Sequence, residues 1–348
     1  MAKLLNRGAT IPYQLRPRKA IERNIFVDLL KKIASYDKIN FTDYRYVGFG
    51  AAYLEDFKQM HLELGIVAMD CIEMDKHAYS RQLFNNPYYF VNSYNISSTD
   101  YIDTDFKFDR NQIVWLDYTM PRYFRQQLTD VETLCSKLVS LDIIKFTFNS
   151  QLRSFISSQS IKKDKYRLCQ ETDLKFILQF LKDDETYKKY LPEEVGVSNL
   201  LNFDTVIRAL AVRAINRGLT LGGKNIKFHH LTSFTYADGQ EMTTITGVVC
   251  TDEEFSKIID QCKLESWPFL KELSESESEF VEAIEIAVPD MTVSERIEID
   301  KRIPAVDINA VAKELIFYYG SNDDEHIHLI NGYHTFYKFL PYFSKVIY

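Results

Sequence analysis

The sequence predicts an α/β fold, in which helices cover both faces of a mostly parallel sheet of seven strands that ends in an antiparallel hairpin. Strand-like apolar runs alternate with mostly helical segments in the first half of the chain, the order produced when crossover helices join parallel strands. These five runs cover residues 44–47, 66–72, 88–92, 113–116 and 143–148. Two more runs, at 226–234 and 242–249, flank Asp238-Gly239, a strong turn signal for a hairpin. With 46% hydrophobic residues, the 348-residue chain can bury a full core.

A helix is expected before the first strand, in an N-terminal helical segment assigned to residues 1–40. Pro17 suits the first turn of a helix, and apolar residues then recur on one face at helical spacing. These apolar residues are Ile21, Ile25, Phe26, Leu29, Leu30 and Ile33. We expect this helix to cover a face or an edge of the sheet.

The α/β domain is expected to span residues 41–264 and to contain a helical insertion at 151–225, where the apolar pattern changes to helical spacing. Residues 265–348 are predicted to form a C-terminal helical extension. Within it, Thr292 followed three residues later by Glu295 has the pattern of a capping box at the start of a helix.

Gly48 and Gly50 follow the first strand-like run, and Glu73 follows the second. Glycines let the backbone turn sharply out of a strand and approach a ligand, and an acidic residue at this place can accept both hydroxyls of a ribose. The pattern therefore indicates a nucleoside-cofactor site, with Met74 beside the adenine. An ordinary tight turn and a surface carboxylate are the alternative interpretations.

Residues after the third and fourth strands extend this site. Asn95 and Ile96 are placed to line the adenine pocket, although an asparagine in a loop is also a common turn former. Asp117 and Tyr118 close the fourth strand, where ligands of open α/β sheets collect. Asp117 can take up a proton, hold an amino group of the cofactor or a metal, or only cap a helix beginning near Pro121. Tyr118 can supply a π face or a hydroxyl.

Composition and spacing exclude several classes of protein. No apolar run approaches ~18 residues and the start of the chain lacks the apolar core of a signal peptide, so a cytoplasmic protein without membrane contact is expected. The five cysteines form no C-x-x-C pair and the histidines no convincing metal set, so neither a disulfide framework nor a metal site is expected, and His61 is interpreted as structural.

A net charge of −7 gives no general attraction to nucleic acid. The segment 14–32 is nevertheless basic, with Arg16, Arg18, Lys19, Arg23, Lys31 and Lys32. This N-terminal helix is therefore a candidate nucleic-acid contact, and a solvated helix face is the alternative.

Several stretches together resemble a bacterial family of O-methyltransferases in the class I S-adenosylmethionine-dependent superfamily. They cover residues 13–26, 46–61, 71–88, 113–118 and 336–343. The hairpin agrees with this resemblance, because class I methyltransferases end their sheet with one, whereas dinucleotide-binding dehydrogenases continue with parallel units. Residues 46–57 resemble the first methyltransferase motif, with Gly48 and Gly50 at its first two glycines, Tyr46 in place of an acidic residue and Ala52 in place of the last glycine.

The resemblance implies a Rossmann-like fold that binds S-adenosyl-L-methionine over Gly48, Gly50 and Glu73, with Asp117 and Tyr118 beside the transferred group. The implied cofactor site is completed by Tyr46, Tyr53, Met74, Asn95 and Ile96. Since the acidic residue of the first motif is missing, a basic residue of the N-terminal helix (Arg16, Lys19 or Arg23) is a candidate to grip the cofactor's carboxylate.

Three functions are compatible with these patterns. The first is an S-adenosylmethionine-dependent methyltransferase acting on an oxygen acceptor, with a role in bacterial antiviral defence. The second is a degenerate methyltransferase fold that serves as a cofactor- or partner-binding module. The third is a nucleic-acid methyltransferase that uses the basic helix. A protein partner or a homo-oligomer is compatible with each of them.

Overall fold

A computed structural model describes residues 16–159, 171–270, 280 and 282–341. Its strands are β1 (Arg45–Gly48), β2 (Ala68–Ile72), β3 (Val91–Tyr94), β4 (Gln112–Asp117), β5 (Asp142–Asn149), β6 (Lys227–Thr232), β7 (Phe234–Ala237), β8 (Glu241–Cys250) and β9 (Ile284–Glu285). Its α-helices are α1 (Pro17–Ile33), α2 (Glu55–Leu64), α3 (Lys76–Asn85), α4 (Ser98–Asp100), α5 (Phe124–Lys137), α6 (Leu152–Ser158), α7 (Glu171–Asp183), α8 (Glu185–Tyr190), α9 (Phe203–Leu221), α10 (Asp252–Cys262), α11 (Val293–Asp300), α12 (Ile308–Glu314) and α13 (Asp323–Phe336). Short helices of other types are η3 (Phe41–Asp43), η4 (Tyr101–Asp105), η5 (Pro121–Tyr123), η6 (Val197–Asn202), η7 (Leu264–Ser266) and η9 (Tyr337–Phe339).

The strands form one sheet in the order β3-β2-β1-β4-β5-β8-β7-β9, with β6 also paired to β8. β1 lies between β2 and β4, and the pairings from β3 across to β5 are all parallel. β8 then runs antiparallel to β5, and both β6 and β7 run antiparallel to β8. The predicted α/β class, with parallel strands followed by an antiparallel hairpin, is confirmed.

The sheet has nine strands where the sequence predicted seven. The expected strand at 226–234 corresponds to β6, whose register against β8 shifts between His230 and Thr232, and a separate strand, β7, begins at Phe234. In addition, β9 pairs with β7 inside a region that was predicted to be helical only. The hairpin turn lies where Asp238-Gly239 placed it, and Gly239 adopts a φ of +94°, which a glycine reaches without steric cost.

The third strand begins later than predicted. The expected strand at 88–92 is shifted to β3, while Tyr88 to Phe90 form the turn before it and Tyr89 is 99% exposed. Their aromatic side chains gave a strand-like pattern, but Tyr88 stacks on Phe90 with ring centroids 5.0 Å apart, so the rings pack within the turn. As a result, β3 ends at Tyr94 and Asn95 follows it directly.

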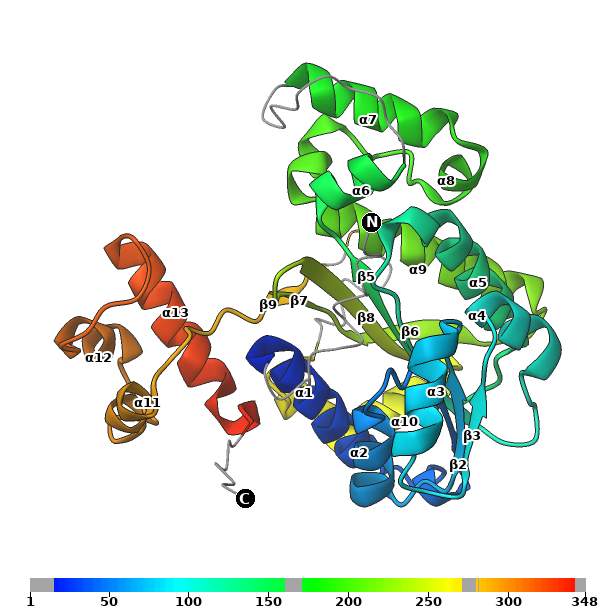
Figure 1. The fold of residues 1–348 in the computed structure, drawn as a ribbon, viewed down its shortest axis with the longest axis horizontal. Coiled ribbons are helices and arrows are strands. Elements are labelled where there is room, and N and C mark those ends of the chain that lie inside the picture. Colours follow the sequence, from blue (N-terminus) through cyan, green and yellow to red (C-terminus); the bar gives the residue numbers. More distant parts are fainter. Residues whose placement is uncertain (1–15, 160–170, 271–279, 281, 342–348) are drawn as a thin grey trace.

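Side chains alternate across the sheet and build one core on each face. Ile113 and Trp115 of β4 face a core shared with α1, α2 and α10, whereas Val114 and Leu116 face a core shared with α5 and α9. Figure 1 shows these helices on the two sides of the sheet, with α6, α7 and α8 beyond α9. The described residues between 151 and 225 are largely helical, and they add to the second face.

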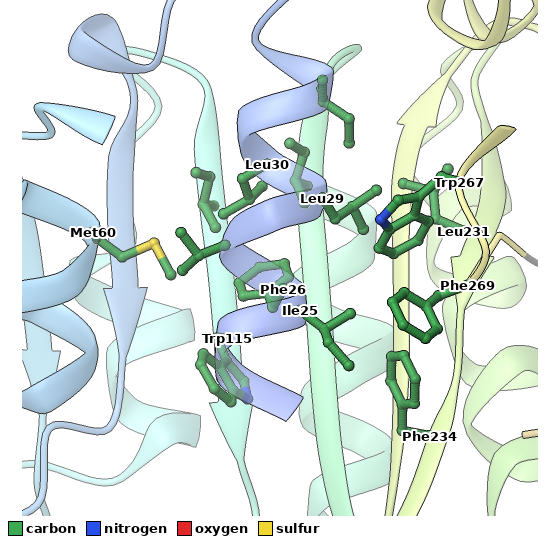
Figure 2. Packing of buried hydrophobic residues seen from close by; sticks show 14 of the residues in the cluster. Ile25, Phe26, Leu29, Leu30, Met60, Trp115, Leu231, Phe234, Trp267 and Phe269 are labelled. Atoms are coloured by element: carbon green, nitrogen blue, oxygen red, sulfur yellow. The ribbon is translucent and has the colours of Figure 1, made fainter. Parts of the chain in front are cut away.

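Helix α1 covers a face of the sheet, as expected. Phe26 meets Trp115 edge to face, with ring centroids 5.5 Å apart, and Ile25, Leu29 and Leu30 are fully buried beside it (Figure 2). The C-terminal helices join the same core, because Phe336 of α13 stacks on Phe269 at 5.7 Å. The capping box of Thr292 and Glu295 at the start of α11 is confirmed.

Within the described part of the chain, the longest and most apolar helices fall short of what a membrane span requires.

Candidate active site

A cavity of about 350 Å³ lies at the carboxyl ends of β1, β2 and β4. Its wall is built mostly by the segments that follow consecutive parallel strands, which is where open α/β sheets bind ligands. From these loops come Phe49, Ala51, Ile72, Glu73, Met74, Ile96, Ser97, Ser98, Thr99, Asp117, Tyr118, Thr119, Met120 and Tyr123. Helix α1 adds Lys19, and α5 adds Gln126, Gln127 and Asp130.

The glycine loop after β1 borders the cavity through Phe49 and Ala51, not through the glycines themselves. A Cβ on Gly50 would lie 2.5 Å from the Cys71 Sγ atom, and one on Gly48 would lie 3.1 Å from the Trp115 carbonyl oxygen. The left-handed conformation in this loop falls on Ala51, with a φ of +44°, and not on either glycine. Gly48 and Gly50 therefore let the loop pack closely on β2 and β4, while the sharp turn itself is made at Ala51.

Helix α3 fixes the glycine loop in this conformation. Gln82, which is fully buried, donates from Nε2 to the Ala51 carbonyl oxygen at 3.2 Å. Asn85 donates from Nδ2 to the Ala52 carbonyl oxygen at 2.8 Å. Backbone strain such as that at Ala51 persists only where neighbours hold it, and these two amides do so. Asn85 thus supports the cavity wall from behind.

Glu73 follows β2 and lies in the cavity wall. Its Oε1 atom accepts a hydrogen bond of 2.8 Å from the Asp75 backbone N–H, which orients the carboxylate. Burial raises the pKa of Glu73, and the Asp75 hydrogen bond only partly opposes this shift. The side chain is neither inserted into the apolar core nor extended into bulk water, so it is available to a ligand in the cavity.

Met74 and Ile96 flank Glu73 in the wall, as expected for an apolar surface beside a flat ring. Asn95 is different: it is exposed, and its Nδ2 atom donates to the Glu73 carbonyl oxygen at 2.7 Å. It therefore stabilises the loop that carries Glu73, and the prediction that it lines the pocket is wrong. The cause is the later start of β3, which turns Asn95 toward the neighbouring loop.

Asp117 ends β4 and forms an ion pair with Lys19 of α1. Both side chains line the cavity and are almost wholly buried, at 8% exposed for Asp117 and 5% for Lys19. Lys19 binds Oδ2, while Oδ1 is buried and has no hydrogen-bond partner among the described residues. Asp117 does not cap the following helix, since neither η5 nor α5 has a side-chain cap.

Tyr118 presents its ring to the cavity, with Phe49 edge to face at 5.4 Å. Its hydroxyl donates to Asp130 Oδ2 at 3.2 Å, and burial together with the Asp130 charge raises the pKa of Tyr118 well above its usual range. The hydroxyl is therefore committed to the protein, and of the two predicted roles only the π face is supported.

Asp130 of α5 organises this side of the cavity, and sequence reasoning did not identify it. Besides Tyr118, its carboxylate accepts hydrogen bonds from Ser98 at 2.6 Å, Thr99 at 2.8 Å and Gln126 at 3.0 Å. Four donors satisfy a buried carboxylate without a cation. Asp130 thereby holds Tyr118, two side chains of α4 and one side chain of α5 in the cavity wall.

Tyr46 and Tyr53 do not line the cavity. Tyr46 is 0% exposed and packs edge to face on Phe57 at 4.9 Å, and burial raises its pKa well above the usual range. Tyr53 lies near α3, where the Arg81 guanidinium is 5.7 Å from its ring centroid. The two tyrosines thus lie outside the wall that the sequence predicted for them, with Tyr46 packed toward α2 and Tyr53 close to Arg81 of α3.

The basic residues predicted to form a surface face of α1 are partly buried and partly engaged in contacts with the rest of the protein. Lys19 and Arg23 are buried, and Arg23 forms an ion pair with Asp56 of α2. Arg18 donates to the carbonyl oxygens of Ala237 and Val288, and Lys31 pairs with Glu63. These contacts tie the helix to the protein, so the nucleic-acid contact predicted for it loses its basis.

A third ion pair, between Glu22 of α1 and Lys145 of β5, lies deep in the core. Lys145 is 1% exposed and its ammonium lies 4.6 Å from the Trp115 ring centroid. Burial lowers the pKa of Lys145, although Glu22 opposes the shift. Helix α1 thus sends three charged side chains, at positions 19, 22 and 23, onto the sheet beneath the cavity.

The described residues contain no cluster of three His, Cys, Asp or Glu side chains suited to a metal ion. Cys71, Cys135, Cys250 and Cys262 are free and buried, while Cys169 lies outside the described residues. His61 is structural, since its Nδ1 atom lies 3.0 Å from the Ile66 carbonyl oxygen.

This strand order, with a cavity over the loops after β1, β2 and β4, defines the class I methyltransferase fold. The model of a protein family described as "Putative O-methyltransferase" matches residues 11–348, which is nearly the whole chain. The protein belongs to this family, and it is an enzyme of the methyltransferase class.

Solved structures with a similar fold include Trm1 from Pyrococcus horikoshii in complex with S-adenosyl-L-methionine, at 10% identity and a TM-score of 0.41, covering 70% of this chain and 58% of that one. Another is the N-methyltransferase NodS from Bradyrhizobium japonicum in complex with S-adenosyl-L-homocysteine, at 10% identity and a TM-score of 0.32, covering 66% and 87%. At such values these likenesses say nothing about the substrate of the present chain. Among curated proteins, none matches it.

Proposed function

We propose that the protein transfers a methyl group from S-adenosyl-L-methionine to an oxygen acceptor. The observation that carries this proposal is the cavity that brings Glu73, Met74, Ile96, Asp117 and Tyr118 together at the carboxyl ends of three parallel strands. Its volume of about 350 Å³ falls within the ~300–1,000 Å³ typical of small-molecule sites. The family description supports the methyl transfer and the oxygen acceptor.

The donor set fits an adenosyl ligand. Glu73 is held by the Asp75 N–H and would accept the hydroxyls of the ribose. Met74 and Ile96, with Ile72, supply an apolar surface for the adenine. On the far side of β1, Lys19 and Asp117 offer one positive and one negative group near the loop of Phe49 and Ala51.

When bound, the cofactor supplies an electrophilic methyl group, which is displaced in line by the acceptor. The protein's own contribution is alignment, which can account for much of such a rate enhancement. Tyr118 and Phe49 form an aromatic wall beside Asp117, and Tyr123, which is 42% exposed, leaves an approach for the acceptor. Asp117 has two candidate roles, either accepting a proton from that acceptor or, through its Oδ1 atom, holding the amino group of the cofactor.

Titration calorimetry with S-adenosyl-L-homocysteine tests the cofactor. The wild-type protein is expected to bind it, and Glu73→Ala is expected to weaken binding ~10- to 100-fold, because two charge-assisted hydrogen bonds are lost. Glu63→Ala is the matched control, since Glu63 is an exposed glutamate on α2 outside the cavity wall. Absence of binding to the wild-type protein, or an unchanged affinity for Glu73→Ala, would contradict the proposal.

A binding module without catalysis is the second candidate. It is favoured by the engagement of both predicted catalytic side chains, Asp117 with Lys19 and Tyr118 with Asp130. This candidate predicts cofactor binding without a methylated product. Transfer of a labelled methyl group to a metabolite extract, lost in Asp117→Ala with the fold intact, would exclude it.

The nucleic-acid acceptor, the antiviral role and the cytoplasmic location remain expectations from the sequence. A nucleic-acid methyltransferase would show salt-dependent retention on DNA or RNA that Arg18→Glu weakens. A role in antiviral defence predicts that Glu73→Ala removes protection of bacterial cells against phage infection.

A further inference from the structure

Lys19 and Asp117 form one end of the cavity, and their pairing distinguishes them from the other buried charges. Helix α1 makes three buried ion pairs, Lys19–Asp117, Arg23–Asp56 and Glu22–Lys145. Of these, only Lys19 and Asp117 are in the cavity wall. The other two pairs are closed inside the core, whereas this pair meets whatever fills the cavity.

The pair offers two opposite charges side by side. The Lys19 ammonium contacts Asp117 Oδ2 and carries three N–H donors in total. The Asp117 Oδ1 atom is buried without a hydrogen-bond partner among the described residues, although a buried carboxylate oxygen is normally satisfied. A ligand that places an ammonium group at Oδ1 and a carboxylate near the Lys19 ammonium would match the charges of both.

Sheet geometry places this pair at a suitable distance from Glu73. Glu73 follows β2 and Asp117 ends β4, with β1 between them. Two strand spacings amount to about 10 Å, roughly the span from a ribose to the end of an amino-acid side arm. A ligand that holds its ribose at Glu73 therefore reaches Lys19 and Asp117 with its other end.

We infer that Lys19 and Asp117 form a clamp for the zwitterionic amino-acid group of the cofactor. Lys19 Nζ donates to the α-carboxylate and Asp117 Oδ1 accepts from the α-ammonium. This inference rests on the proposed function. Tyr46 on β1 stands in place of the acidic residue of the first motif and is buried against Phe57. The clamp therefore supplies the acceptor for the amino group from β4 and not from β1.

Three adenosyl ligands separate the clamp from a purely structural ion pair. S-adenosyl-L-homocysteine carries both groups, decarboxylated S-adenosylmethionine lacks the carboxylate, and 5′-methylthioadenosine lacks both groups. Titration calorimetry measures each ligand against the wild type, Lys19→Met, Lys19→Arg and Asp117→Asn. Lys31→Met is the matched control, because Lys31 lies on the same helix and pairs with Glu63 at the surface.

Lys19→Met is expected to lower the affinity for S-adenosyl-L-homocysteine ~30-fold, which equals ~2 kcal/mol at 1.4 kcal/mol per tenfold change. Its affinities for the other two ligands should stay within about twofold of those of the wild type. Asp117→Asn is expected to lower the affinity for the two ligands that carry an amino group but not the affinity for 5′-methylthioadenosine. Lys19→Arg is expected to recover most of the lost affinity, and Lys31→Met to resemble the wild type.

Equal losses for all three ligands in Lys19→Met would mean that the pair only supports the fold, and would overturn the inference while leaving the proposed function in place. Failure of the wild type to bind any of the three would overturn both. Thermal unfolding of each variant checks its fold. Should Lys19→Met fail to fold because Asp117 is left buried and unpaired, the double variant Lys19→Met/Asp117→Asn carries the same comparison, and equal losses there overturn the inference too.

Discussion

Replacing Gly50 by alanine tests whether the glycine loop depends on space and not on glycine's conformational freedom. The φ of Gly50 lies outside the left-handed region, so alanine can adopt the native backbone conformation there. The new Cβ would lie 2.5 Å from Cys71 Sγ, 3.0 Å from Gln82 Nε2 and 3.2 Å from Leu54 Cδ2. Since heavy atoms normally meet at ~3.5–4.0 Å, Sγ must retreat by about 1 Å.

Cys71 and Gln82, the two closest neighbours of the new Cβ, cannot move freely. Cys71 is fully buried on β2, and its Sγ atom accepts from Gln82 Nε2 at 2.9 Å. Overpacking in such a position costs ~1–3 kcal/mol, so we expect Gly50→Ala to lower the free energy of unfolding by about 2 kcal/mol. The displaced loop also carries Phe49 and Ala51, so the affinity for S-adenosyl-L-homocysteine should fall as well.

Urea denaturation of Gly50→Ala, Cys71→Ala and the double variant measures the coupling between the two positions. Removal of Sγ should relieve the clash, so the double variant should be ~1–2 kcal/mol more stable than the sum of the single changes predicts. Gly196→Ala is the control, because its Cβ would have no neighbour closer than 3.7 Å. A Gly50→Ala protein within ~0.5 kcal/mol of the wild type, or additive effects, would refute the argument.

Three further predictions concern buried charge. Lys145→Met should lower the free energy of unfolding by ~3–5 kcal/mol, because Glu22 is left buried without its cation. Adding Glu22→Met to the same chain should restore much of the lost stability. A loss below ~1 kcal/mol for Lys145→Met in urea denaturation would contradict this expectation. Burial raises the pKa of Asp142 from 3.8 to about 6, so its stabilisation is complete below pH ~4 and lost as the pH rises through 6. The stability advantage over Asp142→Asn should therefore shrink by ~2 kcal/mol from pH 4 to 7, and a constant difference would refute it. Burial also raises the pKa of Glu73, so the affinity for S-adenosyl-L-homocysteine should fall on acidification as Glu73 takes up a proton. In calorimetry, Glu73→Gln should lack this part of the pH dependence of the affinity, and the same pH dependence in both proteins would contradict the argument.

Much of the fold and half of the site could be predicted because they follow from local patterns. Apolar runs separated by helices specify parallel strands, and the carboxyl ends of such strands meet at one edge of a sheet. Glu73 follows β2 and Asp117 ends β4, the strands on either side of β1, so their approach to one cavity required no knowledge of side-chain packing. The Asp-Gly turn fixed the hairpin in the same way, because Gly239 adopts the conformation that such turns need.

The role of α1 was open to prediction but was not recognised. Glu22 and Arg23 lie three and four residues after Lys19, and Phe26 lies four and three residues after them, so these side chains share the stripe that packs on the sheet. Charged residues within an apolar stripe indicate buried ion pairs, whereas the count of basic residues alone suggested a solvated face. Asp130 gave no such signal, because its donors come from Ser98, Thr99, Tyr118 and Gln126 on three different elements.

The sequence by itself determined the succession of strands along the chain, the hairpin and the position of Glu73 after β2, since each depends on residues close together in the chain. Only the tertiary structure decided that Lys19 meets Asp117, 98 residues away, and that Tyr46 and Asn95 face away from the cavity. The physical reason is that alternation along a strand determines two faces but not which helix covers each of them. The partner of a charged side chain is therefore known only once the helices are placed on the sheet.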